Sequence, residues 1–305
     1  MTKAMIELPT FALVMRAVEI HLIFASLAGL AAWAATSSRR VSATAKYWIW
    51  VAASINFLLP VGVLVDRLRP PDVAWALPLE DFGNAVARRG AFGAALAVVW
   101  CGGAVLMIAR LCLRIRASSA AVSEDAPAVR GVLRPRISLP PGIESVLTAA
   151  ELEAVLLHER THARRRDNLI RLVHEVGACV FWFHPLVWLA GSRLSLYREL
   201  SCDESVIRRS RGRELVSALM KLTNPSETLL LQAGASSYMA DRVARLALPP
   251  RTSAAASGLR AAVFAVVLLA CILASAFQSN LMHRAQLGEF CSRGPAELAG
   301  RLDPR

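Results

Sequence analysis

The stretch VLLHERTH, residues 155–162, places the pattern His-Glu-x-x-His in a segment that the sequence predicts to be helical. Thr148 is the expected N-cap of that helix, and Glu151, three residues later, fits a capping box. At 3.6 residues per turn, His158 and His162 lie one above the other on one face, where two imidazoles can bind one Zn²⁺. Glu159 is then suited to act as general base on a water molecule that the metal activates. The alternative is a helix that carries two solvated histidines by chance.

A catalytic zinc site needs a third protein ligand and one open position. The segment YRELSCDE, residues 197–204, supplies the candidates. Glu199 and Asp203 are four residues apart and share a helix face, so Glu199 is the predicted third ligand and Asp203 the predicted hydrogen-bond partner of a histidine. Glu204 is predicted to face solvent. Without the upstream histidines, an acidic turn on a surface helix would be the better interpretation.

Residues 163–168, ARRRDN, directly follow the histidine helix. Asp167 could orient a zinc-binding imidazole, because such a ring usually donates its second N–H to a carboxylate or carbonyl. The arginines are predicted to form a solvated face near lipid headgroups. A second helix is expected over about 169–183 and a third from about Pro185 through Arg208.

The second predicted helix contains a partial copy of the zinc motif. His174-Glu175 begins like it, but Ala178 stands where the second histidine would be. We therefore expect an ordinary polar pair on an amphipathic helix. His184, just before Pro185, is predicted to be a helix-entry residue rather than a ligand.

The composition argues for a membrane protein, because 55% of the 305 residues are hydrophobic and the mean hydropathy is +0.44. Four blocks reach the roughly 20 residues that cross a bilayer. They lie at about 11–35, 47–65, 91–113 and 259–277. The first is expected to be a retained helix and not a signal peptide. The sequence thus predicts a mainly α, polytopic protein with four transmembrane helices and a small β element.

The charge pattern predicts the orientation of these spans. The link between the first two carries Arg39, Arg40 and Lys46 and no acid, which favours the cytoplasmic side. Both termini would then lie outside. The predicted domains are a three-span region (1–116), a cytoplasmic zinc domain (117–258), the fourth span (259–277) and an extracytoplasmic tail (278–305). The net charge of +12 fits this topology and an anionic lipid surface, and no pattern for direct nucleic-acid binding occurs.

Residues 130–141, RGVLRPRISLPP, combine Val and Ile with several prolines and predict a short edge strand. An exposed edge beside a protease site can pair with an extended substrate backbone. Arg136, Ile137 and Ser138 are therefore tentative substrate-binding residues, with a plain structural strand as the alternative.

Several of these motifs, in this order, resemble the BlaR/MecR-type membrane metallopeptidases of peptidase family M56. They are HERTHARRRDN (158–168), FWFHPLVW (181–188) and RELSCDESV (198–206), with RPRISLP (134–140) upstream and DRVARL (241–246) downstream. The resemblance implies a gluzincin site with His158, His162 and Glu199 on Zn²⁺, Glu159 as base and Asp203 in support. It also implies a bacterial inner-membrane protein. In sensor members, the protease cleaves a cytoplasmic repressor or itself after a signal from outside.

The sequence departs from the sensor members in one respect. Those members carry a penicillin-binding domain after the fourth span, whereas residues 278–305 contain no Ser-x-x-Lys motif. The sequence therefore does not predict β-lactam sensing by this chain alone. The leading hypothesis is a membrane zinc endopeptidase that acts on a protein substrate. The alternatives are a quality-control protease with the same site, a non-catalytic membrane transducer and, less favoured, a lipid-binding module.

Overall fold

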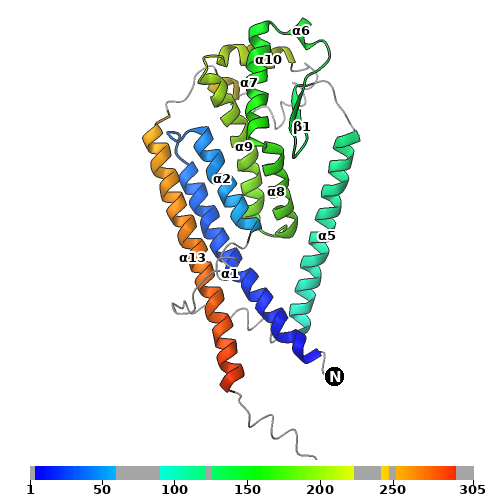
Figure 1. Cartoon of the computed structure of the whole chain (residues 1–305), viewed down its shortest axis with the longest axis vertical. Coiled ribbons are helices and arrows are strands. Elements are labelled where there is room, and N and C mark those ends of the chain that lie inside the picture. Colours follow the sequence, from blue (N-terminus) through cyan, green and yellow to red (C-terminus); the bar gives the residue numbers. More distant parts are fainter. Residues whose placement is uncertain (1–3, 60–89, 121–125, 223–241, 247–251, 293–305) are drawn as a thin grey trace, which may run out of the picture. The chain divides into compact units, whose positions relative to one another are not determined.

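The structure is a computed structural model that describes residues 4–59, 90–120, 126–222, 242–246 and 252–292. It is mainly helical, with one two-stranded sheet (Figure 1). The chain forms two compact units. The first comprises residues 1–28, 59–99 and 266–305, and the second comprises residues 29–58 and 100–265. All of the predicted site residues belong to the second unit.

Within the described residues, three helices are long and apolar enough to cross a membrane. They are α1 (Ala4–Thr36), α5 (Gly90–Ala120) and α13 (Ala254–Ser292), with candidate spans at Val18–Thr36, Ala95–Ala117 and Ala254–Ser275. These spans correspond to the first, third and fourth that the sequence predicts. Their apolar side chains are widely exposed on α5 and α13, as expected of helices that face lipid.

The second predicted span, 47–65, is not among these three, so four spans are not confirmed. Its helix α2 (Ala43–Leu58) packs against α8 (Asp167–Val180) and α9 (Pro185–Ile207), and residues 60–65 lie outside the described residues. Tyr47, Trp50 and Phe57 are buried. Protein contacts therefore account for much of the apolar character that the sequence analysis assigned to lipid.

The small β element is an antiparallel hairpin of β1 (Ala128–Arg130) and β2 (Arg136–Ser138). It contacts α7 (Ala149–Arg165), the helix that carries the His-Glu-x-x-His motif. The short α6 (Ile143–Val146) leads from the hairpin to α7, and α10 (Gly212–Leu222) packs against α7 farther along the chain.

The predicted capping box at the start of α7 is confirmed. The Glu151 amide donates to Thr148 Oγ1, and the Thr148 amide donates to Glu151 Oε2. Lys221 on α10 also donates to Glu151 Oε2, at 2.7 Å. One carboxylate thus fixes the first turn of α7 and joins it to α10. Loss of such a cap typically destabilises a protein by about 0.5–2 kcal/mol.

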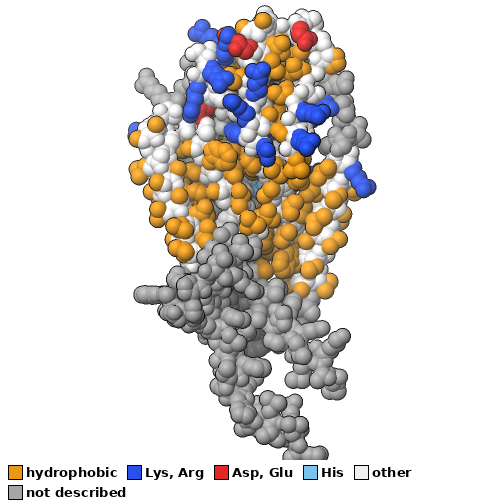
Figure 2. Space-filling view, in the orientation of Figure 1, with side chains coloured by type: hydrophobic (Ala, Val, Ile, Leu, Met, Phe, Trp, Pro, Cys, Tyr) orange, Lys and Arg blue, Asp and Glu red, His pale blue; other side chains and the backbone are white. Residues whose placement is uncertain are grey.

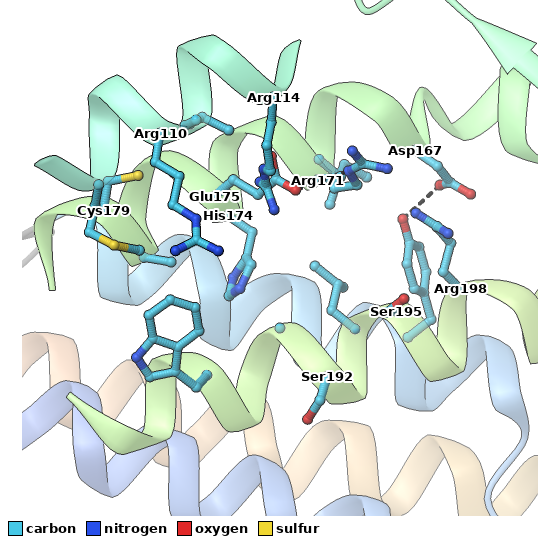
Figure 3. A pocket seen from close by; sticks show the side chains of 18 residues that line it. Arg110, Arg114, Asp167, Arg171, His174, Glu175, Cys179, Ser192, Ser195 and Arg198 are labelled. Carbon is cyan, nitrogen blue, oxygen red and sulfur yellow. Dashed lines mark hydrogen bonds and ion pairs between the residues drawn. The ribbon is translucent and has the colours of Figure 1, made fainter. Parts of the chain in front are cut away.

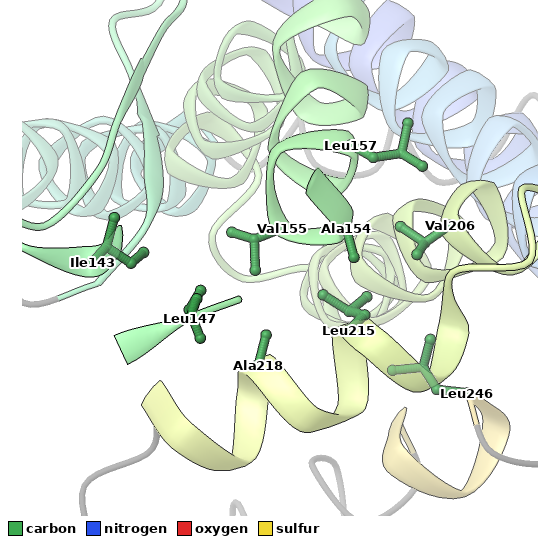
Figure 4. Packing of buried hydrophobic residues seen from close by; sticks show 9 residues of the cluster. All are labelled: Ile143, Leu147, Ala154, Val155, Leu157, Val206, Leu215, Ala218 and Leu246. Carbon is green, nitrogen blue, oxygen red and sulfur yellow. The ribbon is translucent and has the colours of Figure 1, made fainter. Parts of the chain in front are cut away.

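The helix α7 buries one apolar face, which holds the motif in place. Its residues Ala154, Val155 and Leu157 lie in a cluster with apolar side chains from neighbouring segments (Figure 4). The other members of the cluster are Ile143, Leu147, Val206, Leu215, Ala218 and Leu246. Because His158 directly follows this face, packing of the cluster fixes the direction in which the histidines point.

A single residue separates α7 from α8. Arg166 ends one helix and precedes the next with φ 55° and ψ 47°, in the left-handed region. The chain therefore turns sharply, and Asp167 returns toward the last turn of α7. The second and third predicted helices are confirmed as α8 and α9, although α8 begins at Asp167 and ends at Val180.

On the face shown in Figure 2, Lys and Arg side chains gather over one end of the described surface, and hydrophobic side chains cover most of the remainder. This separation of charge from apolar surface is expected of a membrane protein with a polar domain.

Candidate metal centre

The two histidines of the motif and Glu199 converge on one point between α7 and α9. His158 Nε2 lies 3.2 Å from His162 Nε2. Glu199 Oε2 lies 3.6 Å from the first of these nitrogens and 3.7 Å from the second. Three potential ligand atoms thus form a nearly equilateral triangle, and all three side chains are largely buried.

The outer nitrogen of each imidazole faces a carboxylate. His162 Nδ1 lies 2.7 Å from Asp167 Oδ2, and His158 Nδ1 lies 3.1 Å from Asp203 Oδ1. A carboxylate in this position places the proton of a neutral ring on Nδ1. Each Nε2 then presents its lone pair to the centre of the triangle.

This donor set fits a zinc ion. Zn–N and Zn–O bonds of about 2.0–2.2 Å in a tetrahedron place the ligand atoms about 3.3–3.5 Å apart. The observed separations of 3.2, 3.6 and 3.7 Å are close to that spacing. Two imidazoles and one carboxylate also leave a fourth position open, as in catalytic zinc sites.

The electrostatics of the cluster suit a bound cation. Burial lowers the pKa of both histidines, but the facing carboxylates outweigh it. The pKa of His158 is raised, and the pKa of His162 rises to about 12 through hydrogen bonds that include Asp167. Although burial opposes it, the histidines hold the pKa of Glu199 well below its usual range. In the metal-free protein the rings therefore hold protons that zinc must displace, so zinc affinity increases with pH.

Asp167 is the centre of a buried hydrogen-bond network. Besides His162, its carboxylate accepts the Tyr47 hydroxyl at 2.7 Å and Arg165 Nη2 at 2.6 Å. These charged and hydrogen-bonding partners keep the pKa of the Asp167 carboxyl low despite burial, which raises it. Asp167 is thus located where the sequence analysis places it, beside a motif histidine. Tyr47 was not identified as a site residue, and nothing in its local sequence indicates this contact.

Arg165 differs from the solvated face predicted for the arginines. Its side chain is only 12% exposed, lies 4.4 Å from the Tyr47 ring centroid and also donates to the Arg198 carbonyl. The guanidinium therefore compensates the buried Asp167 carboxylate, which is the usual condition for burying a charge.

A second arginine that the sequence analysis did not assign to the site supports Asp203. Arg242 Nε donates to Asp203 Oδ2 and its Nη2 donates to Oδ1, each at 2.8 Å. Arg242 Nη1 also lies 3.9 Å from Glu199 Oε2. The motif at 241–246 was the only sequence signal for Arg242, and that motif does not indicate that Arg242 pairs with Asp203.

Cys202 is an alternative third ligand, because its sulfur lies within 4.8 Å of one ring nitrogen of each motif histidine. Burial, however, raises the pKa of the Cys202 thiol, and Arg165 Nη2 already donates to the sulfur at 2.9 Å. The carboxyl of Glu199 has a lowered pKa and is ionised, which is the state that binds a metal. We therefore favour Glu199.

Glu204 was predicted to face solvent, and this is wrong. Its Oε2 accepts the backbone amide of Thr44 at 2.9 Å and the Thr44 hydroxyl at 2.8 Å, while Arg208 binds Oε1. Thr44 lies in the first turn of α2, where amides have no partner within the helix. Glu204 thus joins α9 to the start of α2.

Glu159 lies on α7 beside His158 and is half-buried. In the described part of the chain, no hydrogen bond or ion pair engages its carboxylate. The tentative substrate residues Arg136, Ile137 and Ser138 form β2, which pairs only with β1 among the described residues. Asn168 Nδ2 donates to the Val129 carbonyl at 2.9 Å and so connects this hairpin to the residue next to Asp167.

Two other histidines of the second unit, His174 and His184, are not members of this cluster. Glu175 pairs with Arg171 and Arg114, as expected of a polar pair, and burial lowers the pKa of His174. His184 is the N-cap of α9, which confirms it as a helix-entry residue.

Comparisons with known proteins cover the segment that carries these residues. Residues 113–246 match the family model described as BlaR1 peptidase M56. The regulatory protein BlaR1 of Bacillus licheniformis is 42% identical over 82 residues, which is 27% of this chain and 14% of that protein. The methicillin resistance mecR1 protein of Staphylococcus aureus is 27% identical over 84 residues, 28% of this chain and 14% of that protein. No solved structure matches.

The match and the helices together define a class. It comprises proteins with helices long and apolar enough to cross a membrane and a segment, here 113–246, that is similar to a family of metallopeptidases. Within that class, the segment resembles the M56 peptidases of BlaR/MecR type. The matched segments span about one seventh (14%) of the length of each of these relatives.

Proposed function

We propose that the chain is a zinc-dependent endopeptidase with His158, His162 and Glu199 as metal ligands and Glu159 as general base. The observation that carries the proposal is the triangle of two Nε2 atoms and one Oε2 atom, 3.2–3.7 Å apart, with each Nδ1 facing a carboxylate. The match of residues 113–246 to the M56 family model supports it.

When bound, zinc supplies Lewis-acid chemistry, which acidifies water and polarises a peptide carbonyl oxygen. Glu159 accepts the proton of the attacking water and then delivers it to the leaving amine. Asp167 accepts the Nδ1 proton of His162, and Asp203 lies 3.1 Å from His158 Nδ1, so the two carboxylates favour the tautomer and direction that metal binding requires. Arg242 and Arg165 compensate these two carboxylates and keep them ionised in a buried site.

The substrate in this proposal is a cytoplasmic protein, either a transcriptional repressor or the chain itself, and the cleavage transmits a signal. The names of the two relatives, a regulatory protein and a methicillin resistance protein, support a regulatory function. We place the zinc domain at 117–258 in the cytoplasm, with both termini outside, from the charge of the link at 39–46. The edge of β2 that has no strand partner among the described residues, at Arg136, Ile137 and Ser138, would pair with the extended substrate backbone.

The experiment that tests the proposal compares the detergent-purified protein with its Glu159→Ala variant. Zinc content is measured on both, and proteolysis is scored on co-expressed repressor candidates and on the chain itself. We expect about one zinc per chain in both proteins and cleavage by the wild type alone. If the wild type binds no zinc, the ligand assignment is wrong. If both bind zinc and neither cleaves any substrate or itself, the outcome favours a non-catalytic transducer.

Cobalt substitution separates Glu199 from Cys202 as the third ligand. A thiolate bound to Co²⁺ gives an intense near-ultraviolet charge-transfer band, which a carboxylate does not. We expect the Co²⁺ protein to lack this band, Glu199→Gln to lose metal affinity, and Cys202→Ser to retain it. A charge-transfer band that Cys202→Ser abolishes would show that the sulfur is the ligand.

A further inference from the structure

A second cavity lies beside the metal centre and contains none of its proposed ligands. It has a volume of about 790 Å³ and is bounded by α5, α8, α9 and Tyr47 of α2 (Figure 3). Pockets of this size are typical of sites for small organic ligands. All of its walls belong to the second compact unit.

Four arginines line the polar part of the cavity. Arg110 and Arg114 project from α5, Arg171 from α8 and Arg198 from α9 (Figure 3). The acidic side chains of the lining are two, Glu175 and Asp167. Two of these charges are compensated outside the lining, because Arg198 pairs with Glu199 and Asp167 pairs with Arg165. The other three arginines face the one remaining carboxylate, Glu175, and this positive excess favours an anionic ligand.

The pairing of these charges shows which arginines are available to a ligand. Glu175 pairs with both Arg171, at 3.1 Å, and Arg114, at 3.2 Å, so one carboxylate serves two guanidinium groups. For Arg110, no hydrogen bond or ion pair occurs within the described residues. A guanidinium has five donors in a fork that suits phosphate oxygens. The cavity therefore contains guanidinium N–H donors that its own carboxylates do not engage, and these donors are available to a phosphate group.

Much of the remaining lining is apolar, and its place along α5 indicates its depth in a membrane. The lining residues of α5 run from Met107 to Arg114, in the last part of the candidate span Ala95–Ala117. Leu111, Ala178 and Trp188 line the same cavity. Arginines at the end of a membrane span lie at the level of lipid headgroups, while the apolar residues before them lie at the level of acyl chains.

We propose that this cavity binds an anionic phospholipid, with its phosphate at Arg110, Arg114 and Arg171 and its acyl chains along the apolar surface of α5. A solvated group of arginines would explain the charge alone. It does not explain a partly open cavity that combines the arginines with apolar walls. The bound lipid would also contact Tyr47 and Asp167, which line the cavity and form the hydrogen-bond network behind His162.

Lipid binding to the full chain in detergent micelles tests this inference. The probes are dioleoylphosphatidylglycerol, dioleoylphosphatidylcholine and inorganic phosphate. The readouts are the midpoint of thermal unfolding and the lipid retained in native mass spectrometry. We expect dioleoylphosphatidylglycerol to bind about tenfold or more tightly than dioleoylphosphatidylcholine. It should also raise the midpoint of thermal unfolding, because a ligand that binds only the folded state stabilises that state.

Paired charge variants locate the site. Arg110→Gln with Arg171→Gln removes two lining arginines, and Arg209→Gln with Arg213→Gln removes the same charge outside the cavity. We expect the preference for the anionic lipid to be lost in the first double variant and kept in the second. Equal losses in both, or no preference in the wild type, would overturn the proposal. An equal shift with inorganic phosphate alone would also overturn it, because the ligand would then be a free anion.

A cavity-filling variant tests the location without a change of charge. Ser195 on α9 lines the cavity and is exposed, so Ser195→Phe should fold and occupy the space of the lipid. We expect Ser195→Phe to retain no dioleoylphosphatidylglycerol. Its midpoint of thermal unfolding in dioleoylphosphatidylcholine should equal that of the wild type. Wild-type lipid retention in Ser195→Phe would place the lipid elsewhere. These readouts use neither zinc nor proteolysis, so they are independent of the proposed function.

Discussion

The most direct test of the metal centre is Asp167→Asn, because this carboxylate accepts three donors at once. They are His162 Nδ1 at 2.7 Å, the Tyr47 hydroxyl at 2.7 Å and Arg165 Nη2 at 2.6 Å. An amide has one oxygen, so at least one of these donors would face the Asn N–H₂ group and lose its acceptor. His162 would then no longer be held in the orientation that metal binding requires.

The expected effects of this variant on zinc affinity and on stability can both be estimated. Loss of a group that orients a ligand histidine typically costs 10–100-fold in metal affinity, which corresponds to about 1.4–2.7 kcal/mol. Removal of one partner of a buried ion pair typically costs about 3–5 kcal/mol of stability. For Asp167→Asn we expect a loss of stability at the low end of this range, because Arg165 keeps its hydrogen bonds to Ser201 and the Arg198 carbonyl.

The assay is competition for zinc against a chromophoric chelator, with thermal unfolding measured on the same samples. The matched control is Glu153→Gln, which removes an exposed carboxylate from the same region and breaks only its pair with Arg211. We expect the control to bind zinc normally and to change stability by less than about 0.5 kcal/mol. Zinc affinity of Asp167→Asn within twofold of the wild type would refute the argument that this carboxylate orients His162.

Three further predictions concern the scaffold, and each is measured by thermal unfolding in detergent. Arg166→Gly should stabilise the protein by about 1 kcal/mol, because only glycine adopts the left-handed region without cost; a loss of stability would contradict this. Lys221 and other hydrogen-bond partners lower the pKa of Glu151 to about 2, so its stabilisation is complete above about pH 4.5 and is lost as the pH falls toward 2. The difference in midpoint between wild type and Glu151→Gln should therefore be largest near pH 6 and shrink below pH 4.5, and a constant difference would disprove the assignment. Gly103→Ala should destabilise the protein by about 1–3 kcal/mol, because its Cβ would overlap the Trp182 ring. Gly102→Ala is the control, because no atom lies within 4 Å of its Cβ, and equal effects of the two would contradict the packing argument.

Much of the centre was predictable because it depends on local periodicity. The spacing of four between His158 and His162 places two rings on one face of any α-helix, and the same spacing applies to Glu199 and Asp203. The capping box depends on Thr148 and Glu151 alone and is confirmed. Hydropathy likewise located the three spans that the structure contains.

Only the tertiary structure decided which distant side chains complete the site. Tyr47 lies 120 positions from Asp167, and Arg242 lies 39 positions from Asp203, so no local pattern reports either pair. Arg165 and Glu204 were predicted to be solvated because charged residues usually are. In the structure Arg165 donates to the Arg198 carbonyl on α9, and Glu204 accepts the Thr44 amide on α2. The predicted span at 47–65 stays a prediction, because residues 60–65 lie outside the described residues. An apolar helix packed against α8 and α9 has the same hydropathy as one in lipid, because burial in protein and burial in a bilayer both select apolar side chains.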